Sequence, residues 1–475
     1  MSNETTKTYS STIPAPVDEL LAWHRNPGAL NRLMPPWIKV EIKETDGSIE
    51  PGSKVRLRVP LAGPVGTDWL IRHESLDDGS GFADIQQDGP FTSWRHDHRF
   101  LPDTERTSVL EDRLAYGLPA GPAGEAVAGG RISDMLDRMF AMRHLRTRND
   151  LLRHRHAGIE RPLRIAIAGS TGLVGQRLVP FLQGGGHEVF SLVRREARAA
   201  NEISWDPAKG RIEAPKLEGM DAVVNLAGVS IAGGLWTEKR RAAIRNSRVQ
   251  GTHLLATTMA GLSQPPRVFV ATSAVGAYGS RGDETLTEES ALGTGFLADV
   301  CREWEAAADP ARDAGIRVVH PRFGVVFAGE GGMLPLLSLL FKTGLGGPLG
   351  DGRQYMSWIA ADDLVGILLE SIANDSLEGP VNAVSSQLTT NAEFTRAMGK
   401  VLKRPTFLRA PASVMRLVAG DLANDLILTS QRVVPERLDQ AGFRFAFPTL
   451  ESTLRFELGK GDFDYSGSNL PDASR

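Results

Sequence analysis

The spacing of hydrophobic and polar residues along the chain changes near residue 160. Upstream, segments of alternating polar and apolar residues predict short strands separated by turn residues. A longer stretch at residues 132–152 has apolar residues at helical spacing and predicts a closing helix. Downstream, short apolar runs alternate with helical patterns, which predicts strand–helix units and a parallel sheet. The upstream strands are expected at residues 8–13, 54–59, 68–73, 81–87, 93–100 and 107–114.

These patterns divide the chain into an α+β domain, an α/β domain with a doubly wound parallel sheet, a small helical region and a polar tail. The apolar content of 41% in 475 residues allows several domains with cores of their own. The expected boundaries are residues 1–157, 162–388, 389–458 and 459–475, the last of which we expect to be flexible.

The α/β domain opens on a strand at residues 163–168, a glycine-rich turn, and a helix that starts at about residue 173. Gly169 allows a tight turn, Gly172 leaves room for a phosphate, and Gly175 lets the helix pack against the strand. This arrangement predicts dinucleotide binding, and the alternative is a purely structural turn. The expected contacts are Gly169, Ser170, Thr171, Gly172, Leu173, Val174 and Gly175.

The second strand of this domain, residues 187–193, ends in Arg194 and Arg195. An acidic residue at this point accepts a hydrogen bond from the ribose of NAD, whereas guanidinium groups suit the 2′-phosphate of NADP. The sequence therefore favours NADP as cofactor. Glu196 would reverse this choice if it turned inward. The alternative is that both arginines are solvated surface residues that bind no cofactor.

Later strands bring further residues to the same edge of the sheet, because ligands of this fold bind at the carboxyl ends of the strands. We expect strands at residues 221–228, 267–274 and 316–327, and helices at 236–262 and 296–308. The expected cofactor contacts from these strands are Asn225, Leu226, Ala227, Gly228, Thr272 and Arg322, with Ser273 at the reacting end.

In the helical region, Thr390 and Glu393 predict a capping box that opens a helix. Asp362 or Asp363 is expected to cap the preceding helix. Further helices are expected at residues 412–418 and 431–441.

Composition narrows the class of protein. A formal net charge of −3 gives no reason to expect nucleic acid or an anionic membrane as a partner. Cys301 is the single cysteine, so no intramolecular disulfide forms, and a reducing cytoplasm is the expected setting. The sequence contains no apolar run long enough to span a bilayer.

The α/β segments resemble the extended short-chain dehydrogenase/reductase superfamily, in its nucleoside-diphosphate-sugar epimerase-like branch. The resemblance is carried by AGSTGLVG, NSRVQGTHLL, SAVGAYGSRGDETLTEES and GLGGPLGDGRQYMSWIAADDLV, between residue 163 and about residue 450. It implies hydride transfer with a nicotinamide, in which a Tyr with a Lys four residues later exchanges the proton. It also implies that a Ser or Thr at a strand end, here Ser273, orients the substrate.

This chain departs from that pattern at the Tyr–Lys pair. The helix that should carry it has Leu297 and Cys301 in the two positions. Tyr278 is the nearest phenol and a candidate catalytic residue, with a core tyrosine as the alternative. We expect Cys301 to be an ordinary core residue.

The first domain resembles the START-like, polyketide-cyclase-like helix-grip domains, in its order of elements and in phrases such as FTSWRHDHRF and MFAMRH. The resemblance implies a hydrophobic ligand held between sheet and helix. His96 and His98 share a strand face, but the sequence shows no third ligand at convincing spacing, so no metal is expected. The basic end of the long helix, which contains Arg143 and Arg146, is expected to be solvated.

Together these features favour an NADP-dependent oxidoreductase or epimerase-like enzyme acting on a small molecule, a nucleotide sugar being one such class. The alternative is an NADP-binding sensor or scaffold without turnover, which the missing Tyr–Lys pair favours. A homodimer is compatible with either function.

Overall fold

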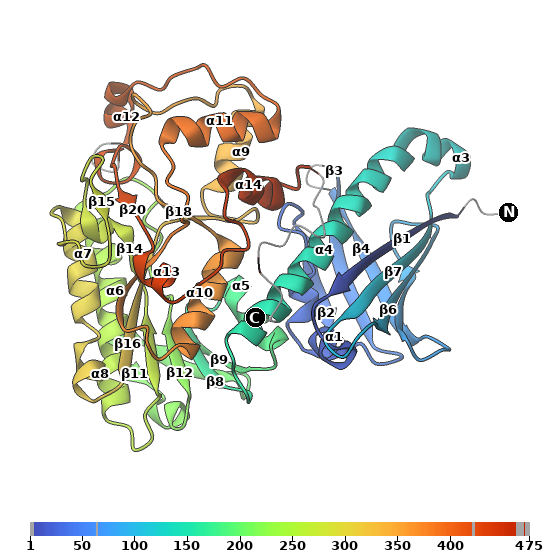
Figure 1. Ribbon diagram of the computed structural model, residues 1–475, viewed down its shortest axis with the longest axis horizontal. Helices are drawn as coiled ribbons and strands as arrows, with labels where there is room; N and C mark the ends of the chain where they lie inside the picture. The colour runs from blue at the N-terminus through green and yellow to red at the C-terminus, as the bar shows by residue number, and fades with distance from the viewer. Residues whose placement is uncertain (1–3, 63–64, 420–422, 462–469, 471–475) are drawn as a thin grey trace. The chain divides into compact units, whose positions relative to one another are not determined.

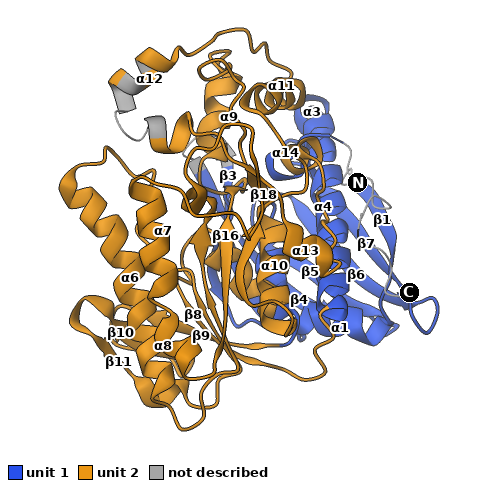
Figure 2. Ribbon diagram, turned by 60° about the vertical axis from the view of Figure 1, so that its left-hand side comes forward, with its two compact units in different colours: residues 1–156, 183–186, 456–475 blue, residues 157–182, 187–455 orange. Residues whose placement is uncertain are grey.

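The computed structural model describes residues 4–62, 65–419, 423–461 and 470. The chain forms two compact units, which are coloured separately in Figure 2. Unit 1 comprises residues 1–156, 183–186 and 456–475, and unit 2 comprises residues 157–182 and 187–455. Most of the tail expected at 459–475 lies outside the described residues.

Unit 1 is a seven-stranded antiparallel sheet in the order β1-β7-β6-β5-β4-β3-β2, with the long helix α4 along one face (Figure 1). Phe140 of α4 stacks on Tyr9 of β1 at 4.4 Å and packs in a core with Trp94 and Tyr116. The expected strands and the long helix are confirmed. The elements are β1 Thr5–Ile13, α1 Val17–Arg25, α2 Ala29–Arg32, β2 Glu41–Thr45, β3 Lys54–Ala62, β4 Val65–Ser75, β5 Gly81–Asp88, β6 Ser93–Pro102, β7 Ser108–Gly117, α3 Gly121–Gly124 and α4 Gly130–His156.

Two features of unit 1 differ from expectation. Strand β2 was not predicted, because four of its five residues are exposed and polar and only Ile42 faces inward.

The basic part of α4 is not a solvated face. Arg146 is 4% exposed and donates to the carbonyls of Arg32 and Met34, and Arg143 donates to the carbonyl of Leu33. These arginines hold the carbonyls at the end of α2, which a charge pattern does not reveal.

Unit 2 confirms the α/β class with a doubly wound sheet. Its nine-stranded sheet runs β11-β10-β9-β8-β12-β13-β16-β14, with β19 also on β16, and all pairs are parallel except β10 with β11. Helices α5 and α10 pack on one face and α6 on the other, so β8 is buried on both sides. The elements are β8 Arg164–Ala168, α5 Gly175–Gly184, β9 Glu188–Val193, β10 Glu202–Asp206, β11 Arg211–Ile212, β12 Ala222–Asn225, α6 Glu238–Ala260, β13 Val268–Ala271, β14 Ser273–Ala274, β15 Thr285–Leu286, α7 Phe296–Ala306, α8 Asp309–Asp313, β16 Arg317–Phe323, β17 Val325–Phe327, α9 Leu334–Lys342, β18 Trp358–Ala360, α10 Ala361–Ala373 and β19 Gly379–Ala383.

The C-terminal region is mostly helical, and its capping box at Thr390 and Glu393 is confirmed. The single helix expected at 431–441 is wrong, because Pro435 separates a short strand from a short helix. The remaining elements are α11 Asn391–Leu402, α12 Ala412–Ala419, β20 Arg432–Val433, α13 Glu436–Gln440 and α14 Leu450–Leu458.

The expected aspartate cap of α10 is also wrong. Ala360 occupies the cap position, with no side-chain hydrogen bond. Asp363 instead accepts hydrogen bonds from the backbone amides of Ala446 and Phe447, and Asp362 accepts one from Arg177. Both aspartates therefore tie distant segments of unit 2 to α10.

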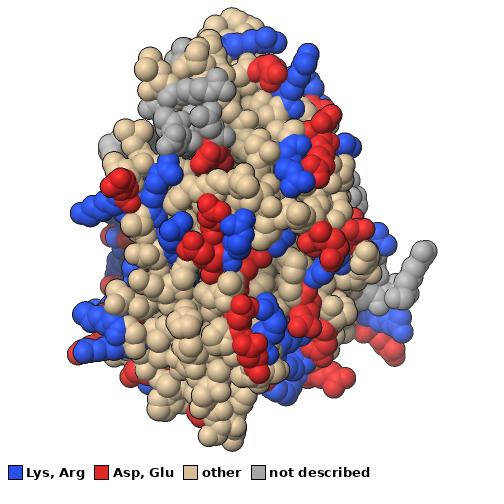
Figure 3. Space-filling model, turned by 90° about the vertical axis from the view of Figure 1, so that its left-hand side faces the viewer, with Lys and Arg blue, Asp and Glu red and all other residues tan. Residues whose placement is uncertain are grey.

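Acidic and basic side chains are interspersed on the face drawn in Figure 3, which suits the small net charge. Within the part of the chain that the structure describes, no helix is both long and apolar enough to cross a membrane.

Candidate functional site: the carboxyl edge of the parallel sheet

The glycine turn between β8 and α5 is packed so tightly that side chains are excluded at two positions. A Cβ at Gly169 would lie 2.8 Å from the backbone of Leu226, and Gly169 also has a φ of +83°. A Cβ at Gly175 would lie 2.3 Å from the carbonyl oxygen of Gly169. A Cβ at Gly172 would meet only that oxygen, at 3.3 Å, so the space beside Gly172 is open. The turn therefore leaves the room that a pyrophosphate needs.

The rest of this turn is accessible. Thr171 and Gly172 are exposed, while Ser170, Leu173 and Val174 are half-buried. The neighbouring strand end contributes half-buried Leu226 and Ala227 and exposed Gly228. Because β8 and β12 are adjacent and parallel, with Ala168 opposite Asn225, these two loops meet at one edge of the sheet.

Asn225 and Thr272 support this edge from inside. The side-chain Nδ2 of Asn225 donates to Thr252 Oγ1 at 2.9 Å, and its side-chain Oδ1 accepts from the backbone amide of Ala227. Thr272 Oγ1 donates to the backbone carbonyl of Asn225 at 2.7 Å. Both side chains are buried, so the geometry argues against the direct cofactor contacts expected of them and gives them a positioning role.

Arg194 and Arg195 follow β9 and differ in their surroundings. The Arg195 guanidinium binds both carboxylate oxygens of Glu202, at 2.8 and 2.5 Å, and the carbonyl of Glu196. Arg194 is exposed, and it makes no hydrogen bond or ion pair to any described residue. Arg194 is thus an exposed cation at the end of this strand with no partner among the described residues.

Ser273 lies where the sequence placed it, at the start of β14 and opposite Arg322 of β16. It is 2% exposed. Cys301 of α7 packs against the same strand, with its sulfur 3.7 Å from the carbonyl oxygen of Ala274. Burial raises the pKa of the Cys301 thiol to about 11, so it is neutral and poorly nucleophilic at neutral pH.

Tyr278 and Arg322 form a closed network rather than a reactive pair. The Tyr278 hydroxyl donates to Asn382 Oδ1 at 2.7 Å and accepts from Arg322 at 2.9 Å. Arg322 also makes two hydrogen bonds of 2.8 Å to Glu305. Tyr278 is fully buried, and burial raises its pKa.

This network argues against two expected roles, a cofactor contact at Arg322 and proton donation by Tyr278. Burial opposes both charges, but the ion pair still raises the pKa of Arg322 and lowers that of Glu305. A phosphate contact at Arg322 would require that buried pair to break, which is costly. Proton donation by Tyr278 would require a substrate to reach a side chain that has no accessible surface. The geometry argues against both roles.

Helix α7 presents Leu297 and Cys301 to the region of the strand end, while its Glu305 is held in the ion pair with Arg322. Leu297 packs against Gly276, since a Cβ placed on Gly276 would lie 3.4 Å from the Cβ of Leu297. Cys301 faces the backbone carbonyl of Ala274. These are the positions in which the superfamily resemblance expects a tyrosine and a lysine. The site can therefore hold a dinucleotide, but it lacks the usual proton-transfer groups.

Two buried arginines near this edge were not singled out by sequence reasoning. Arg177 of α5 binds Glu330 and Asp362, and so fixes the helix that follows the glycine turn. Arg248 of α6 donates to the carbonyl of Val229 and lies over the ring of Trp304 at 5.1 Å. Helical charge patterns make both look solvent-facing, since the partners are distant in sequence.

Comparison with known proteins places these features in context. Residues 165–383 match the model of the NAD dependent epimerase/dehydratase family, and residues 410–457 match a domain of unknown function, DUF1731. The chain is 41% identical over 292 residues to an epimerase family protein, Mb2239, of Mycobacterium bovis, covering 62% of this chain and 96% of the relative. It is 35% identical over 296 residues to the human epimerase family protein SDR39U1, covering 62% and 99%.

Two solved structures extend the comparison. A nucleoside-diphosphate sugar epimerase from Corynebacterium glutamicum matches with a TM-score of 0.80 and 34% identity, over 97% of this chain and 92% of that one. Human SDR39U1 with NADPH matches with a TM-score of 0.58 and 33% identity, over 62% of this chain and 99% of that one. The first similarity includes unit 1 as well as unit 2.

Proposed function

Because the chain belongs to the NAD-dependent epimerase/dehydratase family, we propose that unit 2 binds NADP(H) and performs nicotinamide hydride chemistry on a small molecule. The observation that carries the cofactor choice is Arg194, an exposed guanidinium at the end of β9 beside an accessible glycine turn. A forked cation at this point suits a 2′-phosphate. The NADPH bound by the similar human protein supports the same choice.

The proposed chemistry is that of an oxidoreductase or an epimerase-like enzyme. A nucleotide sugar is the substrate class that the similar Corynebacterium glutamicum protein suggests. Ser273 is the proposed residue for substrate orientation, because it lies at the start of β14, just beyond the carboxyl end of β13. With Tyr278 buried, we propose that the proton that accompanies hydride transfer comes from the substrate or from water.

A second candidate function is an NADP(H)-binding sensor or scaffold without turnover. Leu297 and Cys301 at the expected acid–base positions favour it, since neither side chain exchanges a proton at neutral pH. The two candidates share the cofactor and differ only in chemistry.

Nucleotide titration followed by hydride exchange separates these functions. The protein is first titrated with NADPH and NADH, and the proposal expects tighter NADPH binding. It is then incubated with NADPH deuterated at C4 and a panel of carbonyl compounds that includes nucleotide sugars. Stereospecific transfer of deuterium supports an enzyme, whereas tight binding with no transfer to any compound supports a sensor. Weak binding of both nucleotides contradicts both candidates.

For unit 1 we propose membership of the START-like helix-grip domains, with a ligand between the sheet and α4. The antiparallel sheet with its long helix supports this, as does a cavity of about 100 Å³. The cavity wall mixes apolar Leu30, Ile49 and Phe82 with polar His98 and Arg143. Mass spectrometry of the purified protein under native conditions would detect a retained hydrophobic ligand.

A cytoplasmic location and a homodimer stay predictions.

A further inference from the structure

Unit 1 contains a buried cluster of imidazoles and carboxylates that the nucleotide function does not use. Three of its histidines, His73, His96 and His98, are 6%, 1% and 6% exposed, and Asp112 is 3% exposed. Burying such side chains together costs free energy, because each charged group loses its hydration. We call it the histidine–aspartate cluster, and it consists of His73, Asp84, His96, His98, Asp112 and His144.

The sheet register assembles this cluster. Asp84 of β5 lies opposite His73 of β4 on one side and opposite His96 of β6 on the other. His98 of β6 lies opposite Asp112 of β7. Cross-strand neighbours on one face approach within about 5 Å, so the two carboxylates flank the histidine pair. This register brings a carboxylate beside the two histidines, which the sequence alone did not show.

Asp112 fixes the outer nitrogens of the histidine pair. Its Oδ1 accepts from His96 Nε2 at 2.8 Å and lies 3.0 Å from His98 Nδ1, while its Oδ2 accepts from His144 Nε2 at 2.6 Å. A carboxylate only accepts, so these ring nitrogens carry the hydrogens. Metal-binding histidines are typically oriented by such a carboxylate at the other ring nitrogen.

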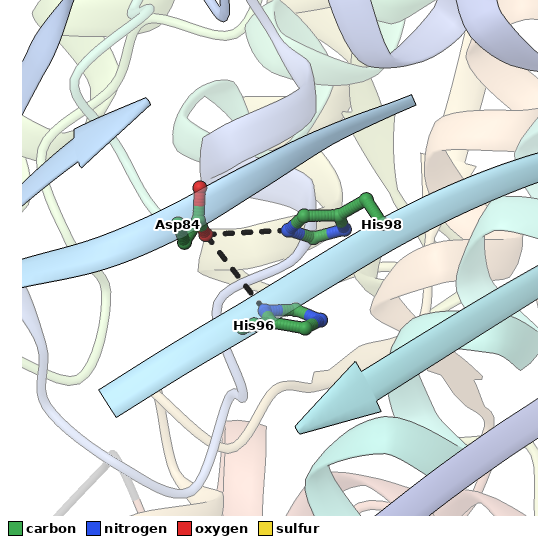
Figure 4. A group of neighbouring side chains, drawn as sticks. All are labelled: Asp84, His96 and His98. Atoms are coloured by element: carbon green, nitrogen blue, oxygen red, sulfur yellow. Dashed lines mark hydrogen bonds and ion pairs between the residues drawn. The ribbon is translucent and has the colours of Figure 1, made fainter. Parts of the chain in front are cut away.

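The inner nitrogens converge on Asp84, as Figure 4 shows. Asp84 Oδ2 lies 3.2 Å from His98 Nε2 and 3.8 Å from His96 Nδ1, and the three ligand atoms lie within 4.8 Å of one another. Ligand atoms about 2.1 Å from a tetrahedral metal ion are roughly 3.4 Å apart. The two distances from Asp84 Oδ2, 3.2 and 3.8 Å, lie on either side of this value.

We propose that Asp84, His96 and His98 bind one divalent transition-metal ion of the zinc class, with Asp112 orienting both imidazoles. Two imidazoles and a carboxylate suit zinc and its first-row neighbours rather than calcium or magnesium. His73 Nδ1, at 2.7 Å from the other oxygen of Asp84, holds that carboxylate in place. The two carboxylates of the cluster balance the charge of one such ion.

The site has an open side. Asp84 and His98 line the cavity of about 100 Å³ in unit 1, together with Arg143. Three protein ligands leave a fourth tetrahedral position for water or for a ligand in that cavity. This site is independent of the nucleotide edge of unit 2, so failure of one proposal leaves the other standing.

Metal binding by the full-length, tag-free protein tests the proposal. The protein is stripped with a chelator, dialysed against Zn²⁺, and analysed by mass spectrometry for metal content. We expect about one equivalent, and Co²⁺ in place of Zn²⁺ should give the visible absorption of a four- or five-coordinate ion. His98→Ala and Asp84→Asn should each abolish stoichiometric binding. Asp112→Asn should weaken binding about 10- to 100-fold.

His24→Gln is the matched control, because His24 lines the same cavity but hydrogen-bonds the Leu20 carbonyl. It should keep the full equivalent. Circular dichroism checks folding, and if His98→Ala does not fold, the nearly isosteric Asp84→Asn decides. Less than a tenth of an equivalent in the unmodified protein overturns the proposal. So does a full equivalent retained in folded Asp84→Asn, and the cluster is then a metal-free ion-pair network.

Discussion

Tyr278 lies five residues beyond Ser273, close enough in sequence to suggest a catalytic phenol. In the structure, its hydroxyl is shared between Asn382 and Arg322, and Arg322 is itself bound to Glu305. The residue-level chemistry at this edge is therefore divided. The polar groups of this network are buried and bind one another, whereas Thr171 and Gly172 of the glycine turn and the Arg194 side chain are exposed.

Tyr278→Phe separates a structural from a catalytic tyrosine. Removing the hydroxyl leaves Asn382 and Arg322 with an unmet hydrogen bond in a buried setting, so we expect a loss of about 1–3 kcal/mol in the free energy of unfolding. NADPH affinity should stay unchanged. Denaturant titration and nucleotide titration measure the two quantities. A stable variant whose hydride exchange falls 100-fold or more would restore the catalytic role.

At the scale of elements, the turn from β8 to α5 combines two requirements in three glycines. Gly175 is needed for the helix to approach the turn, since a Cβ there would collide with backbone atoms of Gly169 and Ser170. Gly172 is free of such collisions, so its missing side chain matters for a ligand rather than for the fold.

Alanine substitutions at these two glycines should have different effects. Gly175→Ala should lower the free energy of unfolding by about 1–3 kcal/mol, because backbone has to shift, and should weaken NADPH binding as well. Gly172→Ala should leave stability nearly unchanged and weaken NADPH binding by about tenfold, since the methyl group fills space needed by a phosphate. Equal effects of both variants on both quantities would contradict the assignment.

Local pattern was enough to predict much of this architecture. The alternation along residues 93–100 predicted that His96 and His98 share a face of their strand, and the glycine turn predicted the start of α5 within two residues. Partners brought together by tertiary structure could not be predicted. Asp84 joins His96 only through strand register, and Arg146 is buried because carbonyls at the end of α2 face it.

At the scale of the whole molecule, the chain combines two cores with different buried chemistry. Unit 1 buries a histidine–aspartate cluster, and unit 2 buries the Arg322 network and His187. His187 Nδ1 accepts a hydrogen bond from the Leu163 amide at 3.2 Å, which a protonated ring could not do. Burial lowers the pKa of His187 to about 4.

Acid should therefore destabilise the protein partly through His187. Its folded pKa lies below the ordinary value of 6.5, so the unfolded chain binds more protons between pH 6.5 and 4. The contribution is fully present above pH 6.5 and falls by up to about 3 kcal/mol as the pH approaches 4. Denaturant titrations across this range should show a flatter pH dependence for His187→Asn. His253→Asn, on the exposed side of α6, should keep the original profile, and an unchanged profile in His187→Asn would exclude this role.

The central claim is that unit 2 selects NADP(H) through Arg194, and the ratio of the dissociation constants for NADPH and NADH tests it most directly. Arg194→Ala should weaken NADPH binding by about 10- to 100-fold, the value of a charge-assisted hydrogen bond, and should leave NADH nearly unchanged. Arg195→Ala is the matched control, since Glu202 already holds that guanidinium, and its effect on NADPH should be clearly smaller. Equal losses for NADPH and NADH in Arg194→Ala would contradict the account.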